Sequence, residues 1–183
     1  EPAEDTPSRD RRYAGWQSQK NSPTIQRTLE QAFEKILQEK VKIAGASRTD
    51  SGVHAQGQVA HFETRSRMTP HEILKALNSY LPKDTAVVKA QEVPEDFHAQ
   101  YSAKSKIYRY TILNQKTRSP LLRHFSYFYP HPLNLALMVQ ESRRLIGRKD
   151  FRSFQATDPA AKDQEKTTIR TIKKLEIKKR GPF

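Results

Sequence analysis

Apolar residues recur at helical spacing in three stretches of the chain. The first stretch follows Ser22 and Pro23, which predicts a helix with Ser22 as its N-cap and Pro23 at the first helical position. The pattern predicts two more helices, one opened by a capping box at residues 69–72 and ended by Pro82, and one over residues 135–146 capped by Gly147. The apolar face of the first helix is formed by Ile25, Leu29, Ala32, Phe33, Ile36 and Leu37.

Shorter stretches, rich in β-branched and aromatic residues, predict strands. Helices and strands mix without a regular alternation, which favours an α+β fold with a mainly antiparallel sheet and flanking helices. Polar residues 158–168 are expected to form a loop, and residues 1–12 a flexible N-terminal arm. The predicted strands lie at residues 41–43, 58–64, 85–93, 106–113, 126–129 and 169–177.

A dense polar run, SRTDSGVHAQ at residues 47–56, lies between two of these predicted strands. Its serine-glycine pair places Asp50 at a turn, where an ionised carboxylate beside Arg48 can act as a nucleophile or a base. The simpler interpretation is an aspartate that caps the turn. Arg48 orients Asp50, binds a phosphate or is simply a solvated surface arginine, and His54 moves a proton, contacts a phosphate or is structural.

Two other kinds of site fit this run poorly. Asp50, His54 and His61 supply one carboxylate and two histidines, without the helix spacing of a zinc site. Ser51 and His54 lack the G-x-S-x-G turn of a serine hydrolase and lie too close in sequence. Because His61 lies within a predicted strand, we expect it to be structural.

The second candidate site is the predicted strand that contains Lys106, Tyr108 and Arg109. Alternation along a strand puts Lys106 and Tyr108 on one face and Arg109 on the other. A tyrosine flanked by cations is typical of a surface that stacks an unpaired base. The alternative is a tyrosine that belongs to the core, and we favour this interpretation for Tyr110.

Composition narrows the class of partner and the compartment. The 183 residues include 33 Lys and Arg against 20 Asp and Glu, which gives a net charge of +13, and the mean hydropathy is −0.86. The release of counterions from phosphates favours a nucleic acid as the partner of such a chain. The absence of cysteine excludes disulfides and thiolate catalysis and is compatible with the cytoplasm. No apolar run has the length of a membrane-spanning helix.

The residues around Asp50 carry a family resemblance. The run from Ala46 to Ala55, followed by GQVAHF at residues 57–62, closely resembles the signature of the bacterial tRNA pseudouridine synthase A family. The resemblance covers about residues 13–177. Its further motifs are Gly15-Trp16-Gln17, Thr24-Ile25-Gln26, Asp96-Phe97-His98-Ala99, Lys106 through Tyr110 and Asp150-Phe151-Arg152-Ser153-Phe154.

This resemblance implies a pseudouridine synthase-like fold of two pseudo-related halves around a basic cleft. It places the family's catalytic aspartate at Asp50, its arginine at Arg48 and its active-site tyrosine at Tyr108. It implies that uridine is isomerised to pseudouridine in the anticodon stem-loop of tRNA, at tRNA positions 38–40, by a homodimer without a metal or organic cofactor. A flipped uridine would lie near Tyr108, and Asp50 would attack the sugar, attack the base or abstract a sugar proton.

The chain departs from the family pattern at its end and in the polar run. Ser47 and Ser51 stand where the family has glycine and alanine, which are also small. Because family members continue past Phe183, we expect the C-terminal part of the fold to be missing, and we expect two halves at residues 13–103 and 104–183. The alternative function is a non-catalytic RNA-binding or RNA-folding module, which would need the basic surface and Tyr108 but not Asp50.

Overall fold

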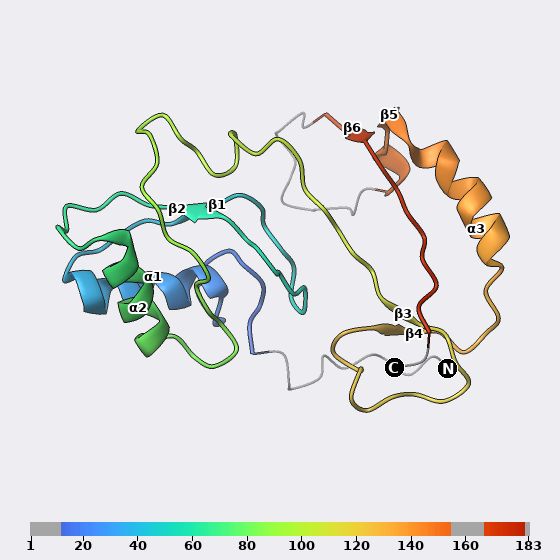
Figure 1. Ribbon diagram of the computed structural model, residues 1–183, viewed down its shortest axis with the longest axis horizontal. Helices are drawn as coiled ribbons and strands as arrows, with labels where there is room; N and C mark the ends of the chain where they lie inside the picture. The colour runs from blue at the N-terminus through green and yellow to red at the C-terminus, as the bar shows by residue number, and fades with distance from the viewer. Residues whose placement is uncertain (1–11, 155–166, 182–183) are drawn as a thin grey trace. The chain divides into compact units, whose positions relative to one another are not determined.

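The computed structural model describes residues 12–154 and 167–181, and it shows an α+β protein (Figure 1). The chain forms two compact units, of which the first ends at Arg109 and the second begins at Tyr110. The first unit holds α1 (Ile25–Leu37), β1 (Ala44–Gly45), β2 (Ala60–His61) and α2 (Pro70–Tyr80). Except for Arg12, the predicted N-terminal arm lies outside the described residues.

The first helix begins two residues later than predicted, because Thr24 and not Ser22 is its N-cap. The Thr24 side chain accepts a hydrogen bond from the Arg27 amide at 3.3 Å, and Thr24 is completely buried. Pro23 lies before the helix, where its carbonyl oxygen accepts a hydrogen bond from the Ala14 amide at 2.9 Å. The proline therefore ties the N-terminal segment to the start of α1.

The second helix confirms the predicted capping box. The Glu72 amide donates to the Thr69 hydroxyl oxygen at 3.3 Å, and the Thr69 amide donates to the Glu72 carboxylate at 2.7 Å. The helix ends at Tyr80, with Leu81 as its C-cap directly before Pro82. Local sequence alone is enough to define both ends of this helix.

The core of the first unit lies between α1 and α2, which are in contact and cross at a steep angle in Figure 1. Apolar residues of both helices and of residues 41–43 bury together there, and the rings of Phe33 and Phe62 meet with centroids 4.2 Å apart. This core also contains the only tryptophan of the chain, Trp16. The buried members are Trp16, Ala32, Phe33, Val41, Ile43, Ile73, Leu77 and Leu81.

The second unit contains short elements and no buried residue among those the structure describes. The two residues of β3 (Ile112–Leu113) pair in parallel with β4 (Tyr127–Phe128). The helix α3 (Leu135–Ser142) ends before the predicted Ile146, with Arg143 and not Gly147 as its C-cap, and the chain continues as the 3₁₀ turn η1 (Arg143–Leu145). Gly147, two residues after this turn, has a φ of +101°. The four residues of β5 (Gly147–Asp150) pair antiparallel with β6 (Ile169–Ile172), and the 3₁₀ turn η2 (Arg152–Phe154) lies between them in sequence.

Four of the six predicted strands are present but shorter, and two are wrong; residues 41–43 form no strand, because the ladder begins only at Ala44. Among the described residues, the strands form three separate two-stranded sheets and not one sheet: β1–β2 and β5–β6 are antiparallel, and β3–β4 is parallel. Residues 85–93 form no strand, because the backbone of Val87 pairs with a side chain: its amide donates to the Asn78 side chain at 2.8 Å, and its carbonyl oxygen accepts from that side chain at 2.8 Å. Of the predicted strand at 106–113, only Ile112 and Leu113 have a ladder partner. Most of the predicted loop at 158–168 lies outside the described residues.

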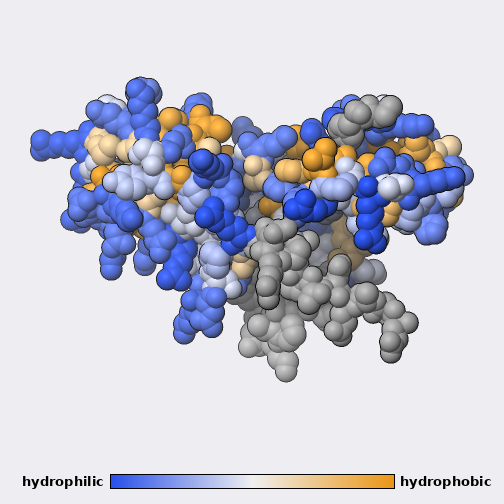
Figure 2. Space-filling view, turned by 90° about the horizontal axis from the view of Figure 1, so that it is seen from below, coloured by the Kyte–Doolittle hydropathy of each residue, from blue (hydrophilic) through white to orange (hydrophobic). Residues whose placement is uncertain are grey.

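The described surface is strongly hydrophilic. Blue, hydrophilic residues cover most of the face seen in Figure 2, with smaller orange patches between them. This surface agrees with the high content of Lys and Arg. Within residues 12–154 and 167–181, no helix has the length and apolar character needed to cross a membrane.

Candidate active site

The polar run at residues 47–56 forms the connection between β1 and β2. These two strands pair antiparallel, with Ala44 opposite His61 and Gly45 opposite Ala60. The ladder is extended on the loop side by a hydrogen bond from the Ala46 amide to the Val59 carbonyl oxygen at 2.8 Å. The two ends of the polar run are therefore held together at one short hairpin stem.

The segment before α1 packs directly against this loop. The Trp16 amide donates to the Thr49 carbonyl oxygen at 3.0 Å, and the backbone of Gly15 lies against the backbone of Thr49 and Asp50. Gly15 has a φ of +102°, and a Cβ built there would overlap the Thr49 carbonyl oxygen. On the stem, a Cβ at Gly45 would lie 2.5 Å from the Trp16 ring. Both glycines are thus required for close approach.

The predicted turn after Asp50 is present. Gly52 has a φ of +78°, and the Val53 amide donates to the Asp50 carbonyl oxygen at 3.2 Å. The Ser51 hydroxyl donates to the Tyr13 carbonyl oxygen at 3.1 Å. The backbone on both sides of the Asp50 side chain is therefore fixed by neighbouring segments.

The side chains of Asp50 and Arg48 are both exposed. Among the described residues, no hydrogen bond or ion pair joins them, so the expected contact between this arginine and this carboxylate is not seen. The carboxylate itself has no hydrogen-bond partner within the described part of the chain. Because both groups are exposed, solvent or a bound molecule can reach them.

The second candidate site meets the first through one side chain. The Lys106 ammonium donates to the Ala46 carbonyl oxygen at 2.8 Å, which ties residues 104–109 to the start of the polar run. Tyr108 is 68% exposed, and no hydrogen bond joins it or Arg109 to the polar run within the described residues. Residues 104–111 have no ladder partner among the described residues, so the predicted placement of Lys106 and Tyr108 on one strand face and Arg109 on the other does not apply. Tyr110, expected in the core, is 88% exposed, so that prediction is wrong.

The two histidines differ in their surroundings. His54 is exposed on the polar run. His61 is half-buried, its Nδ1 accepts a hydrogen bond from the Ala99 amide at 3.2 Å, and its ring packs against the ring of His98 with centroids 4.6 Å apart. These contacts agree with the structural role predicted for His61. No group of three His, Asp or Glu side chains within the described ranges is arranged to hold a metal ion.

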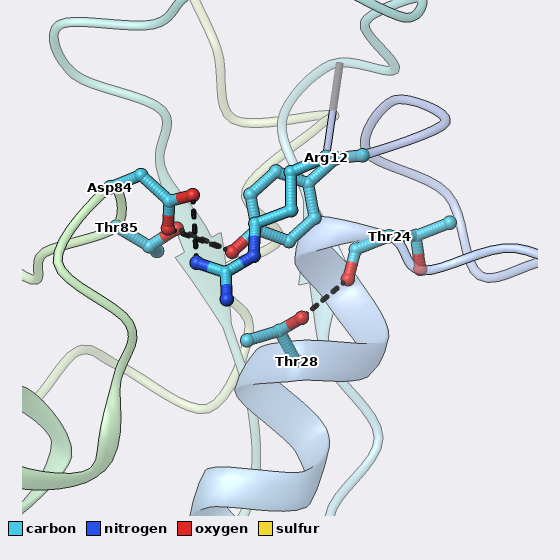
Figure 3. Close-up of polar contacts among 6 residues, drawn as sticks. Arg12, Thr24, Thr28, Asp84 and Thr85 are labelled. Carbon is cyan, nitrogen blue, oxygen red and sulfur yellow. Dashed lines mark hydrogen bonds and ion pairs between the residues drawn. The ribbon is translucent and has the colours of Figure 1, made fainter. Parts of the chain in front are cut away.

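Sequence reasoning missed a polar network centred on Asp84 (Figure 3), which is connected to the polar run through Tyr13. The Tyr13 hydroxyl donates to one carboxylate oxygen of Asp84 at 2.9 Å, and the Arg12 guanidinium pairs with the other at 3.1 Å. The Thr85 hydroxyl donates to the Tyr13 hydroxyl oxygen at 3.4 Å. No motif marks these residues, since Tyr13 and Asp84 lie 71 positions apart in the sequence.

The pKa shifts of Asp84 and Tyr13 agree with the direction of the hydrogen bond between them. Partial burial acts to raise the pKa of Asp84, but the hydrogen bonds from Tyr13 and Arg12 outweigh it, and the pKa lies below its usual value. Burial, together with the hydrogen bond to Asp84, raises the pKa of Tyr13. At neutral pH, the carboxylate is therefore charged and accepts, while the phenol keeps its proton and donates.

Comparison with known proteins places this arrangement in a family. Residues 10–102 match the tRNA pseudouridine synthase family. The chain is similar to the tRNA pseudouridine synthase A of Thermoanaerobacter sp. (strain X514), with 44% identity over 171 residues, which are 93% of this chain and 68% of that protein. It is 45% identical to the tRNA pseudouridine synthase A of Caldicellulosiruptor bescii over 160 residues, 87% of this chain and 64% of that protein.

A third relative, the tRNA pseudouridine synthase A of Myxococcus xanthus, is 43% identical over 166 residues, 91% of this chain and 61% of that protein. The chain thus spans about two thirds of the length of the curated relatives it matches. The chain belongs to the tRNA pseudouridine synthase family, whose members are isomerases that act on uridine in tRNA. The resemblance seen around Asp50 is confirmed.

Proposed function

We propose that residues 47–56 form the catalytic loop of this chain and that Asp50 is its catalytic carboxylate. The observation that carries this proposal is the contrast between the backbone and the side chain of Asp50. The backbone is fixed by the Gly15 contact and the turn to Val53, whereas the exposed carboxylate has no hydrogen-bond partner among the described residues. A group held in place but left open to solvent is arranged for a substrate.

The substrate is a uridine flipped out of tRNA. Tyr108 stacks against the flipped base, which its exposed ring permits. Arg48, Lys106, Arg109 and His54 contact the RNA, the three cations through its phosphates. Asp50 then attacks the sugar, attacks the base or takes a sugar proton, after which the glycosidic bond breaks and the base rejoins through carbon.

The finer features of the function follow the family resemblance. The tRNA element is the anticodon stem-loop, with uridines at tRNA positions 38–40 as targets. The active protein is a cytoplasmic homodimer, in which two pseudo-related halves of the fold surround a basic cleft. The strong net positive charge supports such a cleft.

The test is the conversion of unmodified tRNA by the Asp50→Asn variant, with pseudouridine mapped by position. We expect product to disappear while tRNA affinity changes by less than about threefold, since phosphate contacts and not this carboxylate dominate binding. Glu92→Gln, an exposed charge neutralisation outside the loop, is the matched control and retains turnover. Full turnover by Asp50→Asn would contradict the assignment and favour a non-catalytic RNA-binding role.

A further inference from the structure

Tyr13 is held at both of its ends by different parts of the first unit. Its hydroxyl donates to Asp84, in the segment that follows α2, at 2.9 Å. Its carbonyl oxygen accepts from the Ser51 hydroxyl, in the turn next to Asp50, at 3.1 Å. One half-buried tyrosine therefore connects the segment after α2 to the loop that carries the carboxylate.

The hydroxyl of Tyr13 is held by a charged group, the Asp84 carboxylate. Asp84 accepts from Tyr13 and pairs with Arg12, and Thr85 donates to the Tyr13 hydroxyl oxygen (Figure 3). A hydrogen bond to an ionised carboxylate is roughly twice as strong as one between neutral groups. Arg12 also donates to Asp84, but its side chain is 62% exposed, so solvent screens that contact more than the bond from the half-buried Tyr13. The bond from Tyr13 to Asp84 is thus the main restraint at this end.

The backbone that follows Tyr13 lies directly against the backbone of the Asp50 turn. Two residues after Tyr13, the backbone of Gly15 lies against the Thr49 and Asp50 backbone with no side chain between them. The Trp16 amide then donates to the Thr49 carbonyl oxygen at 3.0 Å. Because these backbone segments are in direct contact, a shift of Tyr13 displaces the backbone of Thr49 and Asp50.

We propose that Tyr13 and Asp84 are positioning residues that set the place of the Asp50 carboxylate in the catalytic loop. This inference rests on the proposed function, in which Asp50 is catalytic. In this role, both residues act through their contacts within the chain and not through contact with the substrate. Their hydrogen bond holds the Tyr13–Trp16 segment, and that segment holds the turn at residues 49–52.

The experiment measures kcat and KM for tRNA in Tyr13→Phe and Asp84→Asn. A misplacement of about 1 Å costs up to roughly a hundredfold in rate, so we expect kcat to fall by about tenfold or more while KM changes by less than about threefold. The double variant is no slower than the slower single variant, because both changes act on the same bond: Tyr13→Phe removes its donor, and Asp84→Asn replaces its charged acceptor with a neutral amide oxygen. Tyr80→Phe, whose hydroxyl has no hydrogen bond among the described residues, is the matched control and keeps its kcat.

Amide hydrogen exchange supplies a readout that does not depend on turnover. In Tyr13→Phe and Asp84→Asn, the amides of Trp16 and Val53 exchange faster, since both donate to the backbone of the Asp50 turn. Arg12→Gln, which removes only the exposed ion pair, leaves kcat and these exchange rates unchanged. Circular dichroism confirms that each variant is folded before it is measured.

The outcomes separate the two proposals. If Asp50→Asn is inactive while Tyr13→Phe and Asp84→Asn keep both the parent kcat and the parent exchange rates, the positioning role is overturned and the catalytic role of Asp50 stands. If Arg12→Gln lowers kcat as much as Asp84→Asn does, the restraint is the ion pair and the assignment to Tyr13 is wrong. Retained turnover in Asp50→Asn would instead overturn the proposed function itself.

Discussion

Gly15 shows how a single residue governs the geometry of the loop. Its positive φ and its contact with the Thr49 carbonyl oxygen are both incompatible with a side chain. Gly57, by contrast, lies at the far end of the same polar stretch, where a Cβ would meet nothing within 4 Å. Substitution at Gly15 and at Gly57 therefore compares a position that requires glycine with one that accepts a side chain.

We predict that Gly15→Ala destabilises the first unit by about 2 kcal/mol or more, since strained backbone and backbone overlap add to each other. Gly57→Ala changes the free energy of unfolding by less than about 0.5 kcal/mol, as is usual for open surface positions. Urea unfolding followed by the fluorescence of Trp16, the only tryptophan, measures both values in the same unit. Equal effects of the two substitutions would contradict the role given to Gly15.

Single residues also show where sequence reasoning reached the candidate site and where it did not. The turn at Asp50 was predictable, because the carboxylate and the Ser51-Gly52 pair that forms the turn are adjacent in sequence. Asp84 and Tyr13 were not, because their hydrogen bond joins positions 71 residues apart and neither lies in a motif. The absence of an ion pair from Arg48 to Asp50 among the described residues was equally out of reach, since side-chain direction depends on the folded turn.

At the level of elements, α2 carries its own start and stop signals. Thr69 and Glu72 satisfy each other's backbone amides, and Pro70 occupies the first turn, where its missing N–H costs nothing. Removal of the Thr69 hydroxyl leaves the Glu72 amide without its acceptor.

We predict that Thr69→Ala lowers the free energy of unfolding of the first unit by about 1 kcal/mol, the usual effect of losing an N-cap. Lys75→Ala, at an exposed position in the middle of the same helix, is the control and stays within about 0.5 kcal/mol of the parent. Thermal unfolding followed by far-UV circular dichroism compares the two. No loss of stability in Thr69→Ala would mean that the cap is replaced by solvent.

Helices and strands differed in how well local sequence predicted them, for a physical reason. The capping box of α2 and the apolar period of α1 act within a few residues, so both helices were predicted to within two residues. A strand exists only where another segment supplies a ladder. Residues 85–93 have strand-like composition, but Asn78 takes the backbone groups of Val87, and residues 106–111 have no paired partner in the described part of the chain.

For the molecule as a whole, the net charge of +13 is the dominant property. Part of it is compensated locally: Glu176 pairs with Lys174 and Lys178, and these contacts lower its pKa to about 2. Lys179 and Arg180 are exposed and form no ion pair within the described residues. They are available to phosphates, which are the main source of affinity in complexes with nucleic acids.

We predict that salt acts on tRNA binding and not on the isomerisation that follows it. Between 50 and 200 mM salt, a protein with about six to ten phosphate contacts loses roughly 10³-fold or more in affinity, so KM rises steeply while kcat at saturating tRNA stays constant.

Replacement of both Lys179 and Arg180 by Gln reduces the slope of log K against log salt by up to about two, one for each lost phosphate contact. Asp50→Asn keeps the parent slope, because the carboxylate neutralises no phosphate. Filter binding across a salt series measures these slopes, and a slope near zero in the parent chain would show that its positive charge does not drive the association with tRNA.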